Sequence, residues 1–235
     1  MQKAKYKRVI IKLSGEALAG EKGNGIDQKV LDVITDQIIA VKNLGVEIGI
    51  IVGGGNFWRG RQGTEMDRSQ ADHMGMLATG INALAIQDAL ERKNAPTRVQ
   101  TALTITRVAE PYILRKAMSH LNKGRIVIFA CGTGNPYFTT DTAAALRAAE
   151  IGAEVLLLAK NVDGIYDSDP KLNKDAKKLD KVSYKEYIAQ NLRAMDMTAI
   201  TICMENKMPV LAFGLFEENA LERAVTGQTI GTLIE

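Results

Sequence analysis

The apolar residues of this chain fall into short continuous runs that are separated by amphipathic stretches. Runs rich in Val, Ile and Leu predict buried strands, because a strand covered on both faces shows no polar alternation. We expect such strands at 8–13, 47–52, 97–101, 126–130, 154–158 and 209–213. Apolar residues at helical spacing predict helices at 28–43, 70–93, 111–122, 142–150, 195–206 and 219–226. The capping box Ser183–Glu186 predicts the start of another helix, and Gly45 is placed to end the first one.

Strands therefore alternate with helices along almost the whole chain. This order is typical of a mostly parallel sheet with helices on both faces, so we predict a three-layer α/β/α sandwich that forms a single domain over residues 1–235. Ligands of such sheets bind at the carboxyl ends of the strands. The segments that follow the strands are accordingly the place to look for a site, and they are rich in Gly, Thr, Asn and Asp.

The most informative of these segments follows the strand at 126–130. It reads Gly132-Thr-Gly-Asn-Pro-Tyr-Phe-Thr-Thr-Asp141 and leads into a helix. A helix start offers unpaired N–H groups and the positive end of the helix dipole, so the segment predicts an anion site. It is not a dinucleotide fingerprint, because Tyr137 stands where the third Gly is required. The segment Gly15–Gly20 has the spacing of a P-loop but lacks its Lys-Ser/Thr.

Two further segments carry positive charge or backbone donors to the same edge of the predicted sheet. Lys12 lies at the end of the first strand, before a Ser-Gly turn, and would neutralise phosphate oxygens there. A lysine that snorkels at a strand edge is the alternative, and the Ser-Gly turn favours the functional interpretation. The glycines Gly53–Gly55 would let the backbone approach a phosphate and supply N–H donors. Arg59 follows within reach, and a guanidinium suits a phosphate.

Three side chains have two interpretations that the residues alone leave open. Asp72 is expected at the start of the long helix, where it would be a cap or would accept hydrogen bonds from ribose hydroxyls. Asp196 has the same ambiguity at a later helix start. Tyr166 belongs to a turn-rich segment and would either stack on a base or only complete the turn.

The composition excludes some classes of function. The 235 residues are 46% hydrophobic and 24% charged, and the net charge of +3 is too small to predict a nucleic-acid partner. No apolar stretch is long enough for a signal peptide or a membrane span, so we expect a cytoplasmic protein without a membrane partner. Cys131 and Cys203 lack metal-ligand spacing and are expected to be buried free thiols.

Five motifs, in order and at similar spacing, resemble the bacterial uridylate (UMP) kinases, a branch of the amino acid kinase superfamily. They are Lys12-Leu-Ser-Gly-Glu-Ala-Leu18, Gly53-Gly-Gly-Asn with Arg59-Gly, Asp72-His-Met-Gly-Met76, the segment Gly132–Asp141, and Val162-Asp-Gly-Ile-Tyr-Asp-Ser-Asp-Pro170. The resemblance implies ATP-dependent phosphorylation of UMP to UDP in pyrimidine nucleotide biosynthesis, with Mg²⁺ held mainly through the ATP phosphates. It also implies a homohexamer that is activated by GTP and inhibited by UTP.

By motif match, the resemblance further implies roles for individual residues. The catalytic residues would be Lys12, Arg59 and Asp141, with Asp141 orienting cations instead of taking a proton. ATP would be bound by Lys12, Leu13, Ser14, Gly15, Gly55, Arg59, Asn161, Tyr166 and Asp169. UMP would be bound by Gly54, Asp72, Thr133, Gly134, Asn135, Pro136, Tyr137, Phe138, Thr139 and Thr140. The response to GTP would involve Gly20, Glu21, Lys22, Gly23, Asn24 and Gly25, where Asn24 replaces the family's usual aromatic residue. The UMP side would lie mainly in the N-terminal part of the chain, and the ATP side mainly at about 155–235.

Two other functions compete with this interpretation. A superfamily kinase that acts on a carboxylate or carbamate would share the fold but would not need the Thr-rich segment. A nucleotide-binding regulatory protein would bind without turnover and would not need Lys12, Arg59 and Asp141 together.

Overall fold

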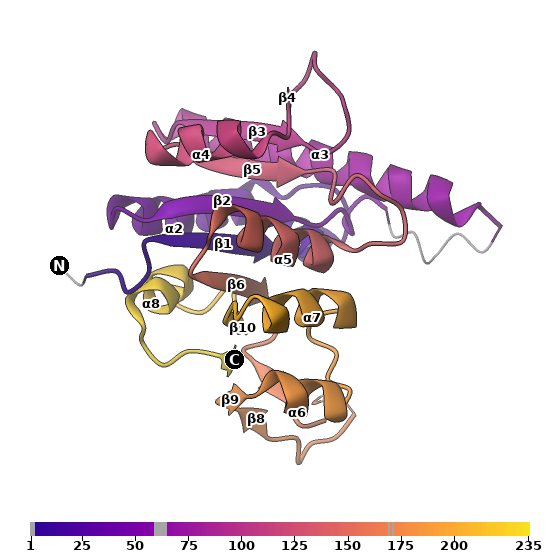
Figure 1. Ribbon diagram of the computed structural model, residues 1–235, viewed down its shortest axis with the longest axis vertical. Helices are drawn as coiled ribbons and strands as arrows, with labels where there is room; N and C mark the ends of the chain where they lie inside the picture. Colours follow the sequence, from indigo (N-terminus) through magenta and orange to yellow (C-terminus); the bar gives the residue numbers. More distant parts are fainter. Residues whose placement is uncertain (1–2, 59–64, 169, 171) are drawn as a thin grey trace.

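The structure is a computed structural model that describes residues 3–58, 65–168, 170 and 172–235, and within them nine strands form one central sheet. The strand order is β4-β3-β5-β2-β1-β6-β10-β11-β9, and all neighbours are parallel except β10 and β11. The strands are β1 (Arg8–Leu13), β2 (Glu47–Val52), β3 (Thr97–Thr101), β4 (Glu110–Pro111), β5 (Ile126–Ala130), β6 (Val155–Lys160), β9 (Lys181–Val182), β10 (Val210–Gly214) and β11 (Thr232–Ile234). The short strands β7 (Ile165–Tyr166) and β8 (Lys178–Leu179) form a separate antiparallel pair. In Figure 1 the central strands lie one above another, and their carboxyl ends point to the right.

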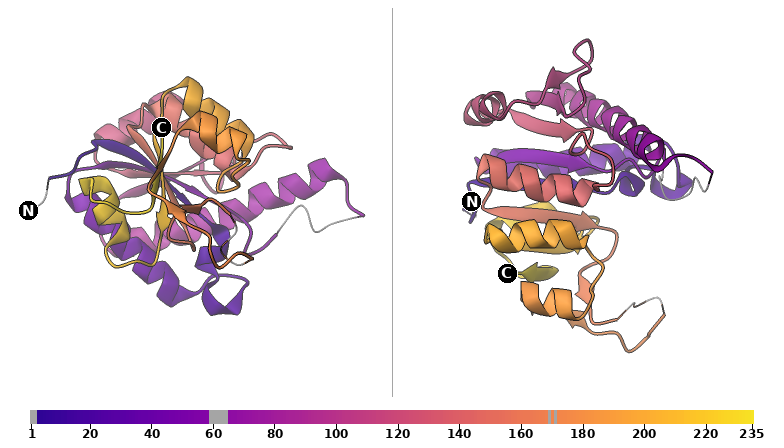
Figure 2. Two further views of the ribbon diagram at one scale, coloured as in Figure 1. Left: turned by 90° about the horizontal axis from the view of Figure 1, so that it is seen from below. Right: turned by 45° about the vertical axis from the view of Figure 1, so that its right-hand side comes forward.

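Helices cover both faces of this sheet, as the two sides of the left-hand view in Figure 2 show. One layer contains α1 (Gly15–Leu18), the 3₁₀ turn η1 (Gly20–Lys22), α2 (Gln28–Asn43), α3 (Arg68–Arg92) and α8 (Ala220–Thr226). The other contains α4 (Leu114–Asn122), α5 (Thr140–Ile151), α6 (Tyr184–Ala189) and α7 (Met197–Glu205). Each layer packs on the sheet through its own cluster of buried residues. The predicted three-layer α/β/α sandwich is confirmed.

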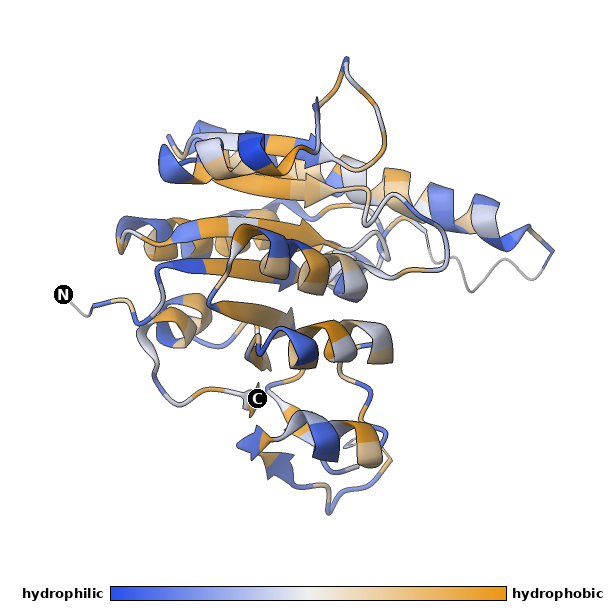
Figure 3. Ribbon diagram, in the orientation of Figure 1, coloured by the Kyte–Doolittle hydropathy of each residue, from blue (hydrophilic) through white to orange (hydrophobic). Residues whose placement is uncertain are grey.

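The apolar runs of the sequence become strands because both of their faces are buried. All five residues of β5 are buried, with Ile128 in the cluster under α2 and α3 and Val127 and Phe129 in the cluster under α4 and α5. Figure 3 shows the central strands in the colour of hydrophobic residues while the outer helices are mixed. Because side chains alternate between the two faces of a sheet, a continuously apolar strand packs against both helix layers at once.

The ends of the helices follow local capping chemistry. Asp27 accepts hydrogen bonds from the N–H groups of Lys29 and Val30 and so begins α2, and Gly45 ends it with a left-handed φ of 82°. The predicted capping box between Ser183 and Glu186 is present at the start of α6.

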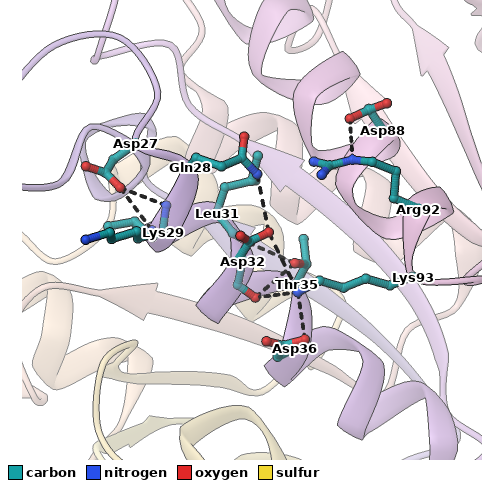
Figure 4. A network of polar contacts seen from close by, with 11 residues as sticks. Asp27, Gln28, Lys29, Leu31, Asp32, Thr35, Asp36, Asp88, Arg92 and Lys93 are labelled. Carbon is teal, nitrogen blue, oxygen red and sulfur yellow. Dashed lines mark hydrogen bonds and ion pairs between the residues drawn. The ribbon is translucent and has the colours of Figure 1, made fainter.

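The C-terminal end of α3 is fastened to the neighbouring helix α2. The ammonium of Lys93 lies 2.6 Å from Asp36 Oδ1 and donates to the carbonyl of Asp32 at 2.9 Å (Figure 4). These contacts hold the far end of α3 while its first turns extend beyond the carboxyl edge of the sheet (Figure 1).

Three local predictions are wrong. Pro111 does not lie in a helix, because it ends the edge strand β4, where a residue without N–H is tolerated, and α4 starts only at Leu114. Asp72 does not cap α3, because the cap is Asp67, which accepts from the N–H of Gln70. The segment after β1 is not a simple turn, because Ser14 leads directly into the one-turn helix α1.

Candidate active site

Lys12 and Asp141 meet at the carboxyl edge of the sheet. Lys12 is the fifth residue of β1, and Asp141 lies in the first turn of α5, which covers that face. The Lys12 ammonium lies 2.6 Å from Asp141 Oδ1, and the two side chains are 13% and 18% exposed. An ion pair with so little solvent around it is screened weakly and has a fixed geometry. The structure therefore brings together two of the three predicted catalytic residues; the third, Arg59, lies outside the described residues.

At the start of α5, more of the backbone N–H groups have hydrogen-bond partners than the sequence predicts. Thr139 is the N-cap, and its Oγ1 accepts from the N–H groups of Asp141 at 3.0 Å and Thr142 at 3.3 Å. The prediction that the N–H groups at this helix start are unpaired is therefore wrong for these two groups. The positive end of the helix dipole remains available to an anion.

Asp196 joins the starts of two helices beside this site. It caps α7 by accepting from the N–H of Ala199 at 2.9 Å. The same carboxylate accepts from the hydroxyls of Thr139 and Thr142 at the start of α5. The cap interpretation of Asp196 is thus correct, and the sequence does not predict its second role. Its effect is to fix α5, and with it Asp141, relative to α7.

The glycines after β2 serve close packing within the protein. A Cβ on Gly15 would lie 2.5 Å from the carbonyl oxygen of Gly53, and one on Gly54 would lie 2.8 Å from the carbonyl oxygen of Gly75. The N–H of Gly53 donates to the carbonyl of Leu13 at 2.9 Å. The expectation that Gly53 offers its N–H to a ligand is therefore wrong. The glycines therefore let β1, β2 and α3 approach each other closely, and a Cβ on Gly53 would lie 3.8 Å from Thr140 Oγ1 at the start of α5.

A pocket with about 520 Å³ of open space lies between α3 and the Gly132–Asp141 segment. Of the ten residues predicted to bind UMP, seven line it: Gly54, Asp72, Thr133, Asn135, Phe138, Thr139 and Thr140. Gly134, Pro136 and Tyr137 are not among its lining residues. The predicted site residues did not include the other six lining residues, which are Trp58, Ala71, Gly75, Met76, Thr79 and Gly132. Trp58 is held by its ring N–H, which donates to the carbonyl of Ala71 at 2.9 Å.

Asp72 holds the Gly132–Asp141 segment against α3 at this pocket. Its Oδ2 accepts from the backbone N–H of Tyr137 at 2.7 Å, and both of its oxygens accept from Arg68 Nε at 3.0 and 2.9 Å. The Arg68 guanidinium also lies 5.4 Å from the centre of the Tyr137 ring. Tyr137 has a left-handed φ of 71°, which is unusual for a large side chain and needs such support.

A second, larger pocket with about 1150 Å³ of open space lies at the end of β6, between residues 162–168 and the segment 190–194. Its lining includes Lys160, Tyr166 and the segment 190–194. The Tyr166 hydroxyl donates to Asp163 Oδ1 at 2.8 Å, so Tyr166 completes its turn and also lines a pocket. Asn161, predicted to bind ATP, is not among the lining residues, and Asp169 lies outside the described residues.

Lys160 is the residue that connects this second pocket with Lys12 and Asp141. It ends β6, and its ammonium donates to the carbonyl of Ala194. Burial lowers the pKa of Lys160, while the nearby Asp141 acts in the opposite direction. The sequence contains the signal that could have found it, because a lysine at the end of an apolar strand is the same pattern that identifies Lys12.

The loop Gly20–Gly25 is tied to the site through two buried asparagines. Asn56 directly follows the glycines, and its amide donates to the carbonyl of Gly25 at 2.7 Å and to Asn82 Oδ1 at 2.9 Å. Asn82 on α3 returns a bond to Asn56 and donates to the carbonyl of Gly53 at 2.7 Å. A displacement of the loop would therefore act on the backbone at Gly53.

Two predictions concern residues away from the pockets. Cys131 and Cys203 are free and buried, as predicted, and burial raises the pKa of Cys203 to about 12. Among the described residues, none of the helices has the length and apolar character that crossing a membrane requires.

A model of the amino acid kinase family matches residues 7–213. The chain belongs to the amino acid kinase family. Solved structures similar to this family member include a UMP kinase from Bacillus anthracis, with 42% identity and a TM-score of 0.95, covering 98% of this chain and 96% of that one. A UMP kinase from Ureaplasma parvum has 37% identity and a TM-score of 0.92, with 100% of both chains covered. A uridylate kinase from Archaeoglobus fulgidus has 25% identity and a TM-score of 0.73, covering 97% of this chain and 99% of that one. The resemblance seen in the five motifs is confirmed.

Proposed function

We propose that this amino acid kinase family member is a UMP kinase, which transfers the γ-phosphoryl group of ATP to UMP and releases UDP and ADP. The observation that carries the proposal is the Lys12–Asp141 ion pair, whose near neighbours line two different pockets. Thr140, the neighbour of Asp141, lines the smaller pocket, and Lys160 lines the larger one. Transfer between two bound nucleotides needs such an arrangement, with a cation between two cavities.

The smaller pocket would hold UMP and the larger one the adenosine part of ATP. Support comes from the seven predicted UMP residues that line the smaller pocket and from Tyr166 in the larger one. Under this assignment the acceptor side lies in the N-terminal part of the chain and the donor side mainly at about 155–235. Lys12, Leu13, Ser14, Gly15 and Gly55 would face the ATP phosphates, and Arg59 would contact the transferred group.

Phosphoryl transfer from ATP to UMP depends on stabilising the negative charge of the phosphates more than on proton transfer. An oxygen of the UMP phosphate, already anionic at pH 7, attacks the γ-phosphorus of ATP, and the bond from that phosphorus to the β,γ-bridging oxygen breaks as ADP leaves. No catalytic base is needed. Lys12 neutralises the oxygens of the transferred group, and Asp141 keeps the ammonium in place. The start of α5 adds the positive end of its dipole.

Mg²⁺ would enter with ATP and be held mainly by the ATP phosphates. The carboxylate of Asp141, beside the Lys12 ammonium, is the side chain that would orient the ion. Mg²⁺ commonly binds through substrate phosphates with one or two carboxylates. The ion would supply further neutralisation of the phosphate charge.

We also propose a cytoplasmic homohexamer that is activated by GTP, is inhibited by UTP and acts in pyrimidine nucleotide synthesis. An apolar stripe on α3 supports self-association, because Leu77, Ile81 and Leu84 are 51%, 50% and 37% exposed. The path from the loop Gly20–Gly25 through Asn56 to Gly53 supports an effector response. Sedimentation of Ile81→Glu tests the assembly, since a charge inside such an interface would release smaller species.

The proposed activity is tested by one coupled assay of ADP release with ATP and four acceptors. UMP should give turnover well above CMP, and carbamate and acetylglutamate should give none. Turnover with carbamate or acetylglutamate in place of UMP would identify another kinase of the superfamily. ATP and UMP binding without turnover by any acceptor would favour the regulatory binding protein.

A further inference from the structure

Lys160 lies on the same face of the sheet as Lys12 and only one strand away. The strands β1 and β6 are parallel neighbours, with Lys12 opposite Leu158. Lys160 is two residues after Leu158, so its side chain leaves the sheet on the same face as that of Lys12. This is the face on which Leu158 packs in the cluster beneath α5 and α7. Two lysines are thus placed beside Asp141, each at the carboxyl end of a central strand.

The ammonium of Lys160 has a neutral partner. It donates to the carbonyl of Ala194, in the segment that leads into α7. That segment is itself anchored, because the buried Tyr187 hydroxyl accepts from the N–H of Met195 at 2.7 Å and donates to its carbonyl at 3.0 Å. A lysine ammonium carries three N–H donors, and Ala194 takes one of them. The donors that Ala194 does not take make a partly buried ammonium such as this a favourable partner for an oxygen anion.

Lys160 lies between the larger pocket, which its side chain lines, and the charged groups around Lys12. The charges that act on it come from Asp141 on α5, Lys12 on β1 and Glu16 on α1. Its own side chain lines the larger pocket, whereas Lys12 is paired with Asp141. An anion that reached from the larger pocket towards Lys12 would pass Lys160 first.

We propose that Lys160 is a second catalytic cation, which binds the β- and γ-phosphate oxygens of the donor nucleotide while Lys12 serves the transferred group. The assignment rests on the proposed function, in which the larger pocket takes ATP. The carbonyl of Ala194 orients the ammonium before the nucleotide arrives, so little reorganisation is needed when the phosphates bind. As the β,γ-bridging oxygen gains charge on bond cleavage, a cation at this position stabilises the leaving ADP.

A purely structural role makes a different prediction. If Lys160 only ties Ala194 to β6, its loss lowers stability and affects both substrates alike. If it binds donor phosphates, its loss affects ATP and kcat and leaves KM for UMP nearly unchanged. Only the charged amine binds phosphate, and burial lowers the pKa of Lys160, so activity should fall as pH rises through that lowered pKa. Arginine stays charged at every accessible pH, so Lys160→Arg should lack this basic limb.

The experiment compares wild type, Lys160→Met, Lys160→Arg and the control Lys185→Met, which removes an exposed lysine of α6. Lys160→Met should lower kcat/KM for ATP about 10²-fold, the scale of one lost charge contact in a transition state, and should weaken Mg·ATP binding measured by calorimetry. Lys160→Arg should recover part of the activity and extend it to higher pH. Lys185→Met should behave as wild type.

Three results would overturn the assignment. They are kcat/KM for ATP within about 3-fold of wild type in Lys160→Met, equal losses for ATP and UMP, or an unchanged basic limb in Lys160→Arg. If Lys160→Met does not fold by circular dichroism, Lys160→Gln, which can still donate to Ala194, takes its place in the same comparisons. Failure of the proposed function is separable, because wild type would then show no turnover with UMP while the calorimetric comparison of ATP binding still reports on Lys160.

Discussion

Replacement of Lys12 probes the centre of the site most directly. In Lys12→Ala the ammonium is lost from a position that is 13% exposed, so water can replace it only in part. The variant Lys12→Met keeps most of the side-chain volume and separates the loss of charge from the loss of packing. We expect both variants to bind ATP and UMP and to fail mainly in kcat.

The size of the effect follows from the geometry of the pair. A unit charge about 4 Å from a phosphate oxygen, at an effective dielectric constant of about 20, is worth about 4 kcal/mol in total. Loss of one preorganised contact to a transition state typically costs about 10²- to 10³-fold in kcat. Asp141 adds to the loss, because its carboxylate, 18% exposed in the intact pair, loses the Lys12 ammonium and repels the incoming phosphates. We therefore expect kcat to fall by about 10²-fold or more.

The assay is initial-rate ADP release at saturating ATP and UMP, with the thermal midpoint measured on the same samples. The double variant Lys12→Met/Asp141→Asn removes both charges and should be less impaired than the product of the two single losses, because the residues act as a unit. Near-normal kcat of Lys12→Ala at saturating ATP would refute the role assigned to this lysine. Lys185→Ala, on the exposed face of α6, is the control for a general loss of positive charge.

Three further variants test other parts of the account. Asp72→Asn should raise KM for UMP more than KM for ATP, because Asp72 lines the smaller pocket and holds the N–H of Tyr137; equal effects on both substrates would contradict a role in the acceptor site. Gly15→Ala should lower stability by about 1–3 kcal/mol, since its Cβ would lie 2.5 Å from the Gly53 oxygen. In the control Gly80→Ala, the atom nearest to the new Cβ would be 3.8 Å away, so this variant should be neutral or slightly more stable in thermal unfolding. The same unfolding midpoint for both variants would contradict the role of Gly15 in close packing. Tyr187→Phe leaves the backbone of Met195 without its partner and should lower the free energy of unfolding in urea by about 1–3 kcal/mol; an unchanged midpoint would show that the segment is held by other contacts.

The layers of the fold and the place of the candidate site at the carboxyl edge of the sheet follow from the sequence because they depend on strong, local signals. The strands β1, β2, β3 and β5 begin and end at the residues predicted from their apolar runs. Lys12 lies near the end of β1, as its place in the first apolar run predicts. The Gly132–Asp141 segment was identified as a strand-to-helix anion site, and its threonines do face a pocket beside α5.

Other parts of the site depend on contacts between distant segments, which no local pattern specifies. Asp196 receives the hydroxyls of Thr139 and Thr142 from more than 50 positions earlier in the chain. The N–H of Gly53 donates to the carbonyl of Leu13, because β1 and β2 are neighbours in the sheet. Such pairings can be predicted only when the order of the strands in the sheet is known. Without that order, a sequence interpretation leaves these groups available to a ligand.

The edge of the sheet shows the same limit in the fold. Pro111 stands three residues before the start of α4, a position compatible with either a helix start or an edge strand. What decides is the pairing of Thr101 with Pro111 in the β3–β4 ladder, a long-range contact. The local sequence around Pro111 was therefore not sufficient to distinguish an edge strand from a helix start.

The central claim is that this chain moves a phosphoryl group from ATP to UMP across the Lys12–Asp141 pair. Incubation with γ-labelled ATP, UMP and Mg²⁺, followed by separation of the nucleotides, tests it directly. The account predicts that the label appears in UDP with wild type and is at least about 10²-fold slower to appear with Lys12→Ala. Label that stays in ATP, or that moves to inorganic phosphate at the same rate with and without UMP, would contradict it.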